Sequence, residues 1–150
     1  MELEDTALFR GIDPAVLAKI REIARVRNYL GNEIIVREGD PAADFYILRD
    51  GKVLLTFTLP QDPDTEIRIA HVGPGETFAW AALAREQTLS AQARALDDSS
   101  VYIIPSKDLH AIFLTHPSAG YEVMTRLADR ILSRLRQTRV ELRWLYQGAR

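Results

Sequence analysis

Residues 35–51, IVREGDPAADFYILRDG, predict two short β-strands joined by a turn. Gly39 and Gly51 permit the positive φ angles that tight turns require, and the carboxylate of Asp40 can accept hydrogen bonds from nearby backbone N–H groups. The apolar run at 45–48 is typical of a strand that is buried on both faces. We therefore expect these residues to form scaffold rather than to carry chemistry.

Further β-rich runs, separated by Gly, Pro and Asp, extend on both sides of this stretch. Including the two runs within this stretch, the β-rich runs are residues 33–36, 45–48, 53–58, 67–72 and 101–104. This spacing indicates a sandwich or jelly roll. Residues 59–64 hold two prolines amid acidic residues and predict a turn or flap between two strands. Residues 79–85 are too rich in alanine for a strand and too few for a full helix, so they form an insert.

Helical spacing of apolar residues returns on either side of the β-rich region. Asp13 and Pro14 predict the N-cap and first turn of a short helix. Its apolar face holds Val16, Leu17, Ile20, Ile23 and Ala24. Ser106 is the expected N-cap of a second helix, over 107–114.

A break at 116–118 precedes one long helix that we expect to end near Gln147. The fold class is therefore mainly β with flanking helices: a double-stranded β-helix, or jelly roll, followed by a long C-terminal helix. We expect one domain over 1–150, made of an N-terminal helical segment (1–27), a β-roll (28–105) and C-terminal helices (106–150).

An apolar stripe follows the long helix at alternating spacings of four and three residues. Its members, here called the dimer seam, are Met124, Ala128, Ile131, Leu135, Thr138, Leu142 and Leu145. This is the a/d pattern of a coiled coil, and a second copy of the helix would cover it, so we predict a parallel homodimer. Alternatively, the stripe packs on the β-roll as core.

Arginines also gather on this helix: Arg126, Arg130, Arg134, Arg136, Arg139 and Arg143. They indicate a solvated coiled-coil flank or an anionic partner.

Composition limits the class of protein. The 150 residues are 47% hydrophobic and 27% charged, with a net charge of −2 and no cysteine. Such a chain folds as one soluble domain without disulfides, thiolate metal sites or a cysteine nucleophile. The longest apolar run has seven residues, at 78–84, whereas a membrane-spanning helix needs about 20. The acidic start is unlike a secretion signal, and we expect a cytoplasmic protein that binds no membrane.

The stretch at 35–51 resembles the first signature of the cyclic nucleotide-binding domain family at every constrained position. The order of helix, strands, insert, strands and two helices resembles that family along nearly the whole chain. The resemblance implies the jelly-roll sensor domain of catabolite-activator-like (Crp/Fnr-like) regulators. It also implies a phosphate-binding cassette in the insert, where backbone N–H groups face a cyclic phosphate.

That cassette is degenerate here. The family pattern is apolar, Gly, Glu, any, small, apolar, a spacer, then Arg, small polar and Ala. This chain supplies Phe78, Ala79, Trp80, Ala81, Ala82, Leu83, a spacer at 84–88, then Leu89, Ser90 and Ala91. The resemblance implies that Trp80 replaces the glutamate that accepts a hydrogen bond from the ribose. It also implies that Leu89 replaces the arginine that pairs with the phosphate.

Loss of this arginine predicts weak nucleotide binding. Each charge-assisted hydrogen bond contributes about 1.5–3 kcal/mol, so affinity for a cyclic nucleotide should fall about a hundredfold or more. We therefore expect binding in the family's usual mode to be weakened or lost. Arg85 in the spacer or Arg94 in the next strand could substitute for it, although both are also typical of solvated surface arginines.

The remaining residues form an apolar cup, for which two interpretations stay open. Either Trp80 closes the cup, or the cup accepts an uncharged or aromatic ligand, with Ser90 and the indole N–H as polar groups. In the family, a Thr or Ser on the long helix can reach the base of the nucleotide. Thr138 occupies about that place here, but it is also typical of a polar residue that sets register in the dimer seam.

Other chemistry finds little support in the sequence. The three histidines, His71, His110 and His116, have no paired spacing, so we expect neither a metal site nor a cofactor, and a haem ligated by His71 is disfavoured. No catalytic triad or glycine-rich phosphate loop occurs, so we expect no enzyme.

Relatives that regulate transcription carry a helix-turn-helix after the long helix. Since this sequence continues only to Arg150, we expect no direct DNA binding. The prediction is a stand-alone, dimeric regulatory ligand sensor. The alternatives are a true cAMP or cGMP receptor that uses Arg85 or Arg94, and a purely structural dimerisation domain.

Overall fold

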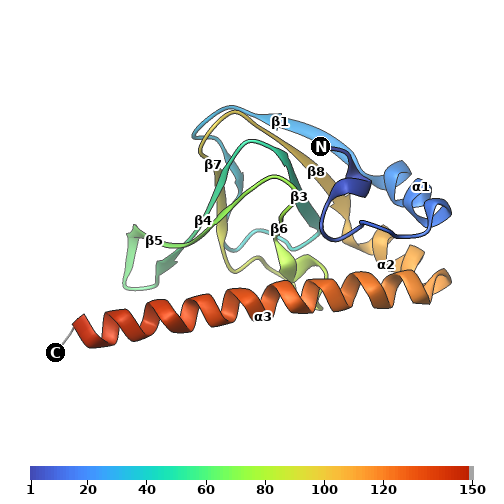
Figure 1. Cartoon of the computed structure of the whole chain (residues 1–150). Helices are drawn as coiled ribbons and strands as arrows, with labels where there is room; N and C mark the ends of the chain where they lie inside the picture. Colours follow the sequence, from blue (N-terminus) through green and yellow to red (C-terminus); the bar gives the residue numbers. More distant parts are fainter. Residues whose placement is uncertain (149–150) are drawn as a thin grey trace.

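Two four-stranded antiparallel sheets face each other in the β-roll of the computed structural model, which describes residues 1–148 (Figure 1). The first sheet has the order β1-β8-β3-β6, formed by Arg25–Tyr29, Ser99–Pro105, Asp44–Asp50 and Thr77–Phe78. The second has the order β2-β7-β4-β5, formed by Ile34–Val36, Gln92–Ala95, Val53–Leu59 and Asp62–Val72. The jelly-roll prediction is confirmed.

The turn between β2 and β3 forms as its sequence predicts. The Asp40 carboxylate accepts a hydrogen bond from the backbone N–H of Arg37 at 2.9 Å, and Gly39 has a φ of 89°. Gly51 has a φ of 104°, and a Cβ there would lie 2.2 Å from the Ser99 hydroxyl oxygen. Only glycine fits this close approach without moving β8.

The helical elements are the 3-10 turn η1 (Leu3–Asp5), α1 (Pro14–Ile23), the 3-10 turn η2 (Trp80–Ala82), α2 (Ser106–Thr115) and α3 (Pro117–Gly148). The helices η1, α1 and α2 and the start of α3 lie at one end of the roll, whereas η2 lies beside β6 (Figure 1). The Asp13 carboxylate accepts a hydrogen bond from the N–H of Ala15 at 2.8 Å, which confirms the predicted N-cap. The N-cap prediction for Ser106 is wrong, because Pro105 holds the cap position and Ser106 is the first helical residue.

Two strands were not expected from the sequence, β1 and β6, whereas β7 confirms the strand expected around Arg94. β1 starts at Arg25, within the segment expected to be helical, because pairing with β8 forms it despite its mostly exposed polar side chains. The turn expected over 59–64 is shorter, since β5 begins at Asp62. As an edge strand, β5 tolerates Pro63, whose missing N–H costs no interstrand hydrogen bond.

Two apolar clusters hold the elements together. One lies between the first sheet and the helices and includes Phe9, Phe45 and Leu109. The other fills the roll between the two sheets and includes Leu48 and Phe78. The inserted turn η2 lies at the boundary of the two clusters, which fixes its position next to α3 (Figure 1).

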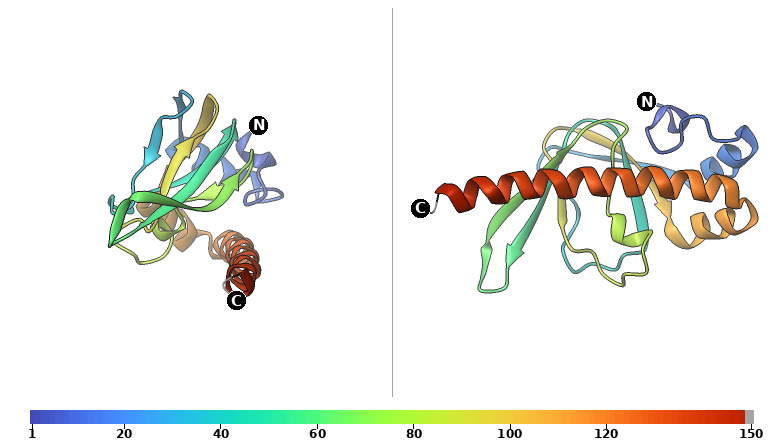
Figure 2. Two further views of the ribbon diagram at one scale, coloured as in Figure 1. Left: turned by 90° about the vertical axis from the view of Figure 1, so that its left-hand side faces the viewer. Right: turned by 60° about the horizontal axis from the view of Figure 1, so that its bottom comes forward.

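Only the first part of α3 is anchored by burial, at Gly120, Val123 and Leu127. Gly120 lets α2 approach closely, since a Cβ there would lie 2.8 Å from Cβ of Phe113. The helix then continues alongside the roll (Figure 2). No helix within residues 1–148 has the length and apolarity needed to span a membrane.

The dimer seam is exposed on this chain. Exposed fractions are 41% for Ile131, 43% for Leu135 and 63% for Leu142. The stripe therefore does not pack on the β-roll as core, which was the alternative expectation. Association through the seam stays a prediction.

Candidate functional site

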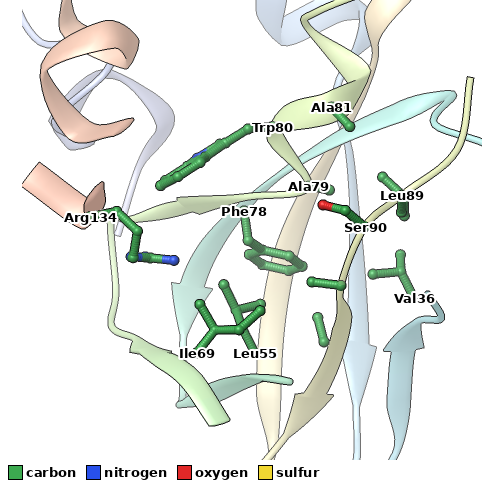
Figure 3. A pocket seen from close by; sticks show the side chains of 12 residues that line it. Val36, Leu55, Ile69, Phe78, Ala79, Trp80, Ala81, Leu89, Ser90 and Arg134 are labelled. Carbon is green, nitrogen blue, oxygen red and sulfur yellow. The ribbon is translucent and has the colours of Figure 1, made fainter. Parts of the chain in front are cut away.

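A cavity of about 150 Å³ opens between η2, the second sheet and α3 (Figure 3). Its walls are mostly apolar, and the lining residues are Val36, Leu55, Ile69, Phe78, Ala79, Trp80, Ala81, Leu89, Ser90, Ala91, Ala93 and Arg134. The two ends of the degenerate cassette, residues 78–81 and 89–91, thus line the same cavity.

Ala79 occupies a strained backbone position at the edge of the cavity. Its φ is 59° and its ψ 45°, in the left-handed region, and it caps the start of η2. The family pattern has glycine here, and an alanine Cβ in this conformation costs about 1–2 kcal/mol. The strained turn directs the chain from β6 into η2 and so presents Trp80.

Trp80 lies at the wall of the cavity, on the side of α3. Its indole Nε1–H donates a hydrogen bond to the Thr77 hydroxyl at 2.8 Å, so this group is already paired and does not serve as the polar group expected from the sequence. The face of the ring lies against Arg134, whose guanidinium carbon is 4.8 Å from the ring centroid. An open space persists beside the indole (Figure 3).

Arg134 is the one charged residue among the five lining residues that were not predicted from the sequence; the others are Val36, Leu55, Ile69 and Ala93. Arg134 comes from α3, and its guanidinium is directed toward Phe78 (Figure 3). Burial lowers the pKa of this guanidinium, Glu76 and Glu141 act in the opposite direction, and Arg130 adds to the lowering. Within residues 1–148, Arg134 makes no ion pair. A signal existed, since Arg134 precedes Thr138 by one helical turn on a helix expected to reach the ligand.

Leu89 stands where the family pattern has its arginine. Its side chain is 5% exposed and lines the cavity. Its backbone pairs with the signature turn: its N–H donates to the Asp40 carbonyl, and its carbonyl accepts from the N–H of Gly39, both at 2.8 Å. The backbone of the β2–β3 turn therefore holds the hydrocarbon side chain of Leu89 against the cavity.

The floor of the cavity is aromatic. Phe78 is 1% exposed and stacks on Tyr46, with ring centroids 5.2 Å apart. Burial, with a smaller effect from Asp44, raises the pKa of the Tyr46 phenol to about 12.

The ten sequence-predicted pocket residues fall into three groups. Seven line the cavity: Phe78, Ala79, Trp80, Ala81, Leu89, Ser90 and Ala91. Ala82 and Leu83 face a separate groove toward α2 and α3. Thr138 is exposed on α3, where its hydroxyl donates to the Arg134 carbonyl at 3.0 Å.

The two arginines considered as substitute phosphate ligands lie outside the cavity lining. Arg94 forms a close ion pair with Glu66, which also accepts a hydrogen bond from the Gln92 side chain. Arg85 lines the separate groove beside Leu83. In the part of the chain that is described, no three His, Cys, Asp or Glu residues are grouped to hold a metal ion.

Comparison with known proteins gives consistent matches. Residues 26–116 match the family model of the cyclic nucleotide-binding domain. Glutaminase 1 of Bradyrhizobium diazoefficiens is 33% identical over 134 residues, which are 89% of this chain and 21% of that protein. The cAMP-dependent protein kinase regulatory subunit of Dictyostelium discoideum is 30% identical over 95 residues, which are 63% of this chain and 29% of that protein.

Among solved structures, the Thermus thermophilus catabolite activator protein aligns with a TM-score of 0.75 at 29% identity, over 94% of this chain and 63% of that one. This chain spans less than two thirds of each of these relatives. The family match covers more than half of the chain, and residues of the inserted cassette line the cavity. The chain therefore belongs to the cyclic nucleotide-binding domain family.

Proposed function

We propose that this chain is a non-enzymatic, dimeric ligand-sensing domain in which the family's usual cyclic nucleotide binding is weakened or lost. The observation that carries the proposal is Leu89, buried at the cavity where the family pattern has an arginine. A cyclic phosphate beside this side chain would lose water without gaining a cationic partner there.

Cavity size supports the same proposal. Sites for drug-sized ligands measure about 300–1,000 Å³, whereas this cavity holds about 150 Å³. A nucleotide would have to displace Trp80 or Arg134 to enter. A smaller ligand needs no such rearrangement.

The position of the cavity supports a regulatory role. Its wall is shared by η2 and α3, and the dimer seam lies on α3. A ligand that separates or tightens Trp80 and Arg134 would shift α3 relative to the roll, and with it the partner helix. A catalytic role is not supported. Ser90 is the one hydroxyl side chain among the described lining residues, and no histidine lines the cavity to act as its base.

Titration with cAMP and cGMP by calorimetry tests the proposal. We expect no binding at micromolar concentrations, because the arginine contact is worth about a hundredfold or more in affinity. Micromolar affinity for either nucleotide would overturn the loss of nucleotide binding. Sedimentation of the same samples tests the dimer.

A further inference from the structure

Arg134 gives the cavity an electrostatic preference for anions. It is the one charged side chain among the described residues that line it. Its guanidinium is directed toward Phe78 (Figure 3). An anion bound at this point would meet a cation that is already in place.

Among residues 1–148, this cation forms no ion pair, although Glu76 and Glu141 lie near enough to raise its pKa. The nearby carboxylate of Glu76 is held by Arg130, with 2.8 Å between Arg130 Nη2 and Glu76 Oε2. Burial acts in the opposite direction and lowers the pKa of Arg134. An anionic ligand would compensate for the water that this guanidinium has lost.

Trp80 orients the guanidinium as well as attracting it. The guanidinium carbon lies over the indole, 4.8 Å from the ring centroid. Stacking on a face leaves the N–H groups on the edge of the guanidinium free for two parallel hydrogen bonds. A carboxylate presents two oxygens that match that edge, as a phosphate also does, so the walls of the cavity must distinguish the two.

The remaining walls determine the size and polarity of the rest of the ligand. Val36, Leu55, Ile69, Phe78 and Leu89 present hydrocarbon to the cavity. An apolar cavity of about 150 Å³ accepts a molecule of about the size of benzene. A bare inorganic anion would be badly solvated against these walls, and a sugar would bury hydroxyl groups without partners.

We propose that the cavity binds a small organic carboxylate of about the size of benzoate, with its carboxylate on Arg134 and its apolar body against Phe78 and Leu89. This ligand class rests on the proposed function, in which the cavity is the sensing site. The ligand would bridge the roll and α3, since Arg134 is the contact from α3.

Calorimetric titration with two probes of similar size tests the charge preference. Benzoate and benzyl alcohol share the ring and differ in the anionic group. We expect benzoate to bind at least about tenfold more tightly, as one charge-assisted contact implies. In Arg134→Gln this preference should disappear while benzyl alcohol still binds, and Arg134→Lys should retain part of it.

Arg136→Gln is the matched control. Arg136 lies two residues along α3, about 200° around the helix from Arg134, so its loss should leave the benzoate preference unchanged. Circular dichroism of each variant checks that α3 is still folded. Equal affinity of the wild type for both probes, an undiminished preference in folded Arg134→Gln, or no benzoate binding at about 10 mM would overturn the proposal.

Titration with cAMP on the same samples distinguishes failure of the carboxylate proposal from failure of the proposed loss of nucleotide binding. Micromolar binding of cAMP would overturn the proposed loss of nucleotide binding. If neither cAMP nor benzoate binds, the carboxylate proposal fails alone and the proposed loss of nucleotide binding stands.

Discussion

The guanidinium of Arg134 packs on the indole of Trp80, with 4.8 Å between the guanidinium carbon and the ring centroid. Trp80 belongs to η2 and Arg134 to α3, so this contact joins the inserted cassette to the long helix. The indole is fixed in turn by its hydrogen bond to Thr77 in β6. A continuous path of contacts therefore runs from the first sheet, past the cavity, to α3.

Restoring the family residues should restore nucleotide binding. In the combined variant Ala79→Gly, Trp80→Glu and Leu89→Arg, we expect cAMP to bind about a hundredfold or more tightly than in the wild type. The new arginine would pair with the phosphate, and the new glutamate with the ribose. Calorimetry measures the change.

The matched control for this variant carries Leu89→Gln in place of Leu89→Arg, which keeps a polar side chain but removes the charge. It should bind cAMP at least about tenfold more weakly than the Leu89→Arg combination, because only the ribose contact is restored. A folded Leu89→Arg combination without measurable cAMP binding would show that Leu89 does not occupy the position of the family's arginine.

Ala79→Gly alone should stabilise the domain. Ala79 has a φ of 59°, and glycine removes the Cβ strain of that conformation, so the free energy of unfolding should rise by about 1 kcal/mol. Urea denaturation measures this. Ala81→Gly, within the helical turn η2, is the control and should lower the free energy of unfolding by up to about 1 kcal/mol. A loss of stability in Ala79→Gly would contradict the strained backbone.

Tyr46 should make the domain sensitive to alkaline pH. Its pKa is raised to about 12, mainly by burial, whereas an unfolded tyrosine titrates near 10. Between pH 10 and pH 12, the Tyr46 phenol loses its proton in the unfolded state before it does so in the folded state. Its contribution to the free energy of unfolding is therefore complete below about pH 10 and is lost as the pH rises toward 12. At pH 11 the loss is about 1.4 kcal/mol.

Urea denaturation at pH 8 and pH 11 measures this effect, with Tyr46→Phe as the comparison. Other effects of pH 11 on stability act on both proteins alike. We expect the phenylalanine variant to lose about 1.4 kcal/mol less than the wild type between the two pH values. Equal losses would mean that the Tyr46 phenol titrates normally in the folded state.

Substitution in the dimer seam should separate the protomers. Leu135→Asp would place two carboxylates in the shared interface, and burial of unpaired charge should weaken dimerisation by at least about a hundredfold. Sedimentation equilibrium measures the association.

Val140 offers a matched position, because it is 49% exposed and lies about 140° around α3 from Leu135. Val140→Asp should leave the dimer intact. Equal effects of the two substitutions, or a monomeric wild type, would count against the seam.

Local signals made the fold predictable. The turn at Gly39 and Asp40 and the buried strand that follows are encoded within residues 35–51, and the helices follow their apolar periodicity. β1 escaped prediction because pairing with β8 stabilises it, while its own side chains are largely exposed and polar. The prediction of Ser106 as an N-cap was wrong because β8 extends to Pro105 and α2 begins at the next residue, with no separate capping residue between them.

The candidate site was predictable only where it is continuous in sequence. The cassette from Phe78 to Ala91 could be compared position by position with the family pattern. Arg134 lies more than 40 residues later, on a helix with six arginines, and periodicity does not distinguish the one that meets Trp80. That contact depends on the path of α3 across the roll, which tertiary packing sets.

The anchoring of α3 at one end makes it a lever. Burial holds the helix as far as Leu127, and from there to Gly148 it extends about 31 Å. A tilt of about 5° at this pivot would carry the far end by about 3 Å. A displacement too small to disturb the packing around Trp80 and Arg134 would thus be amplified to about the width of a side chain at the tip.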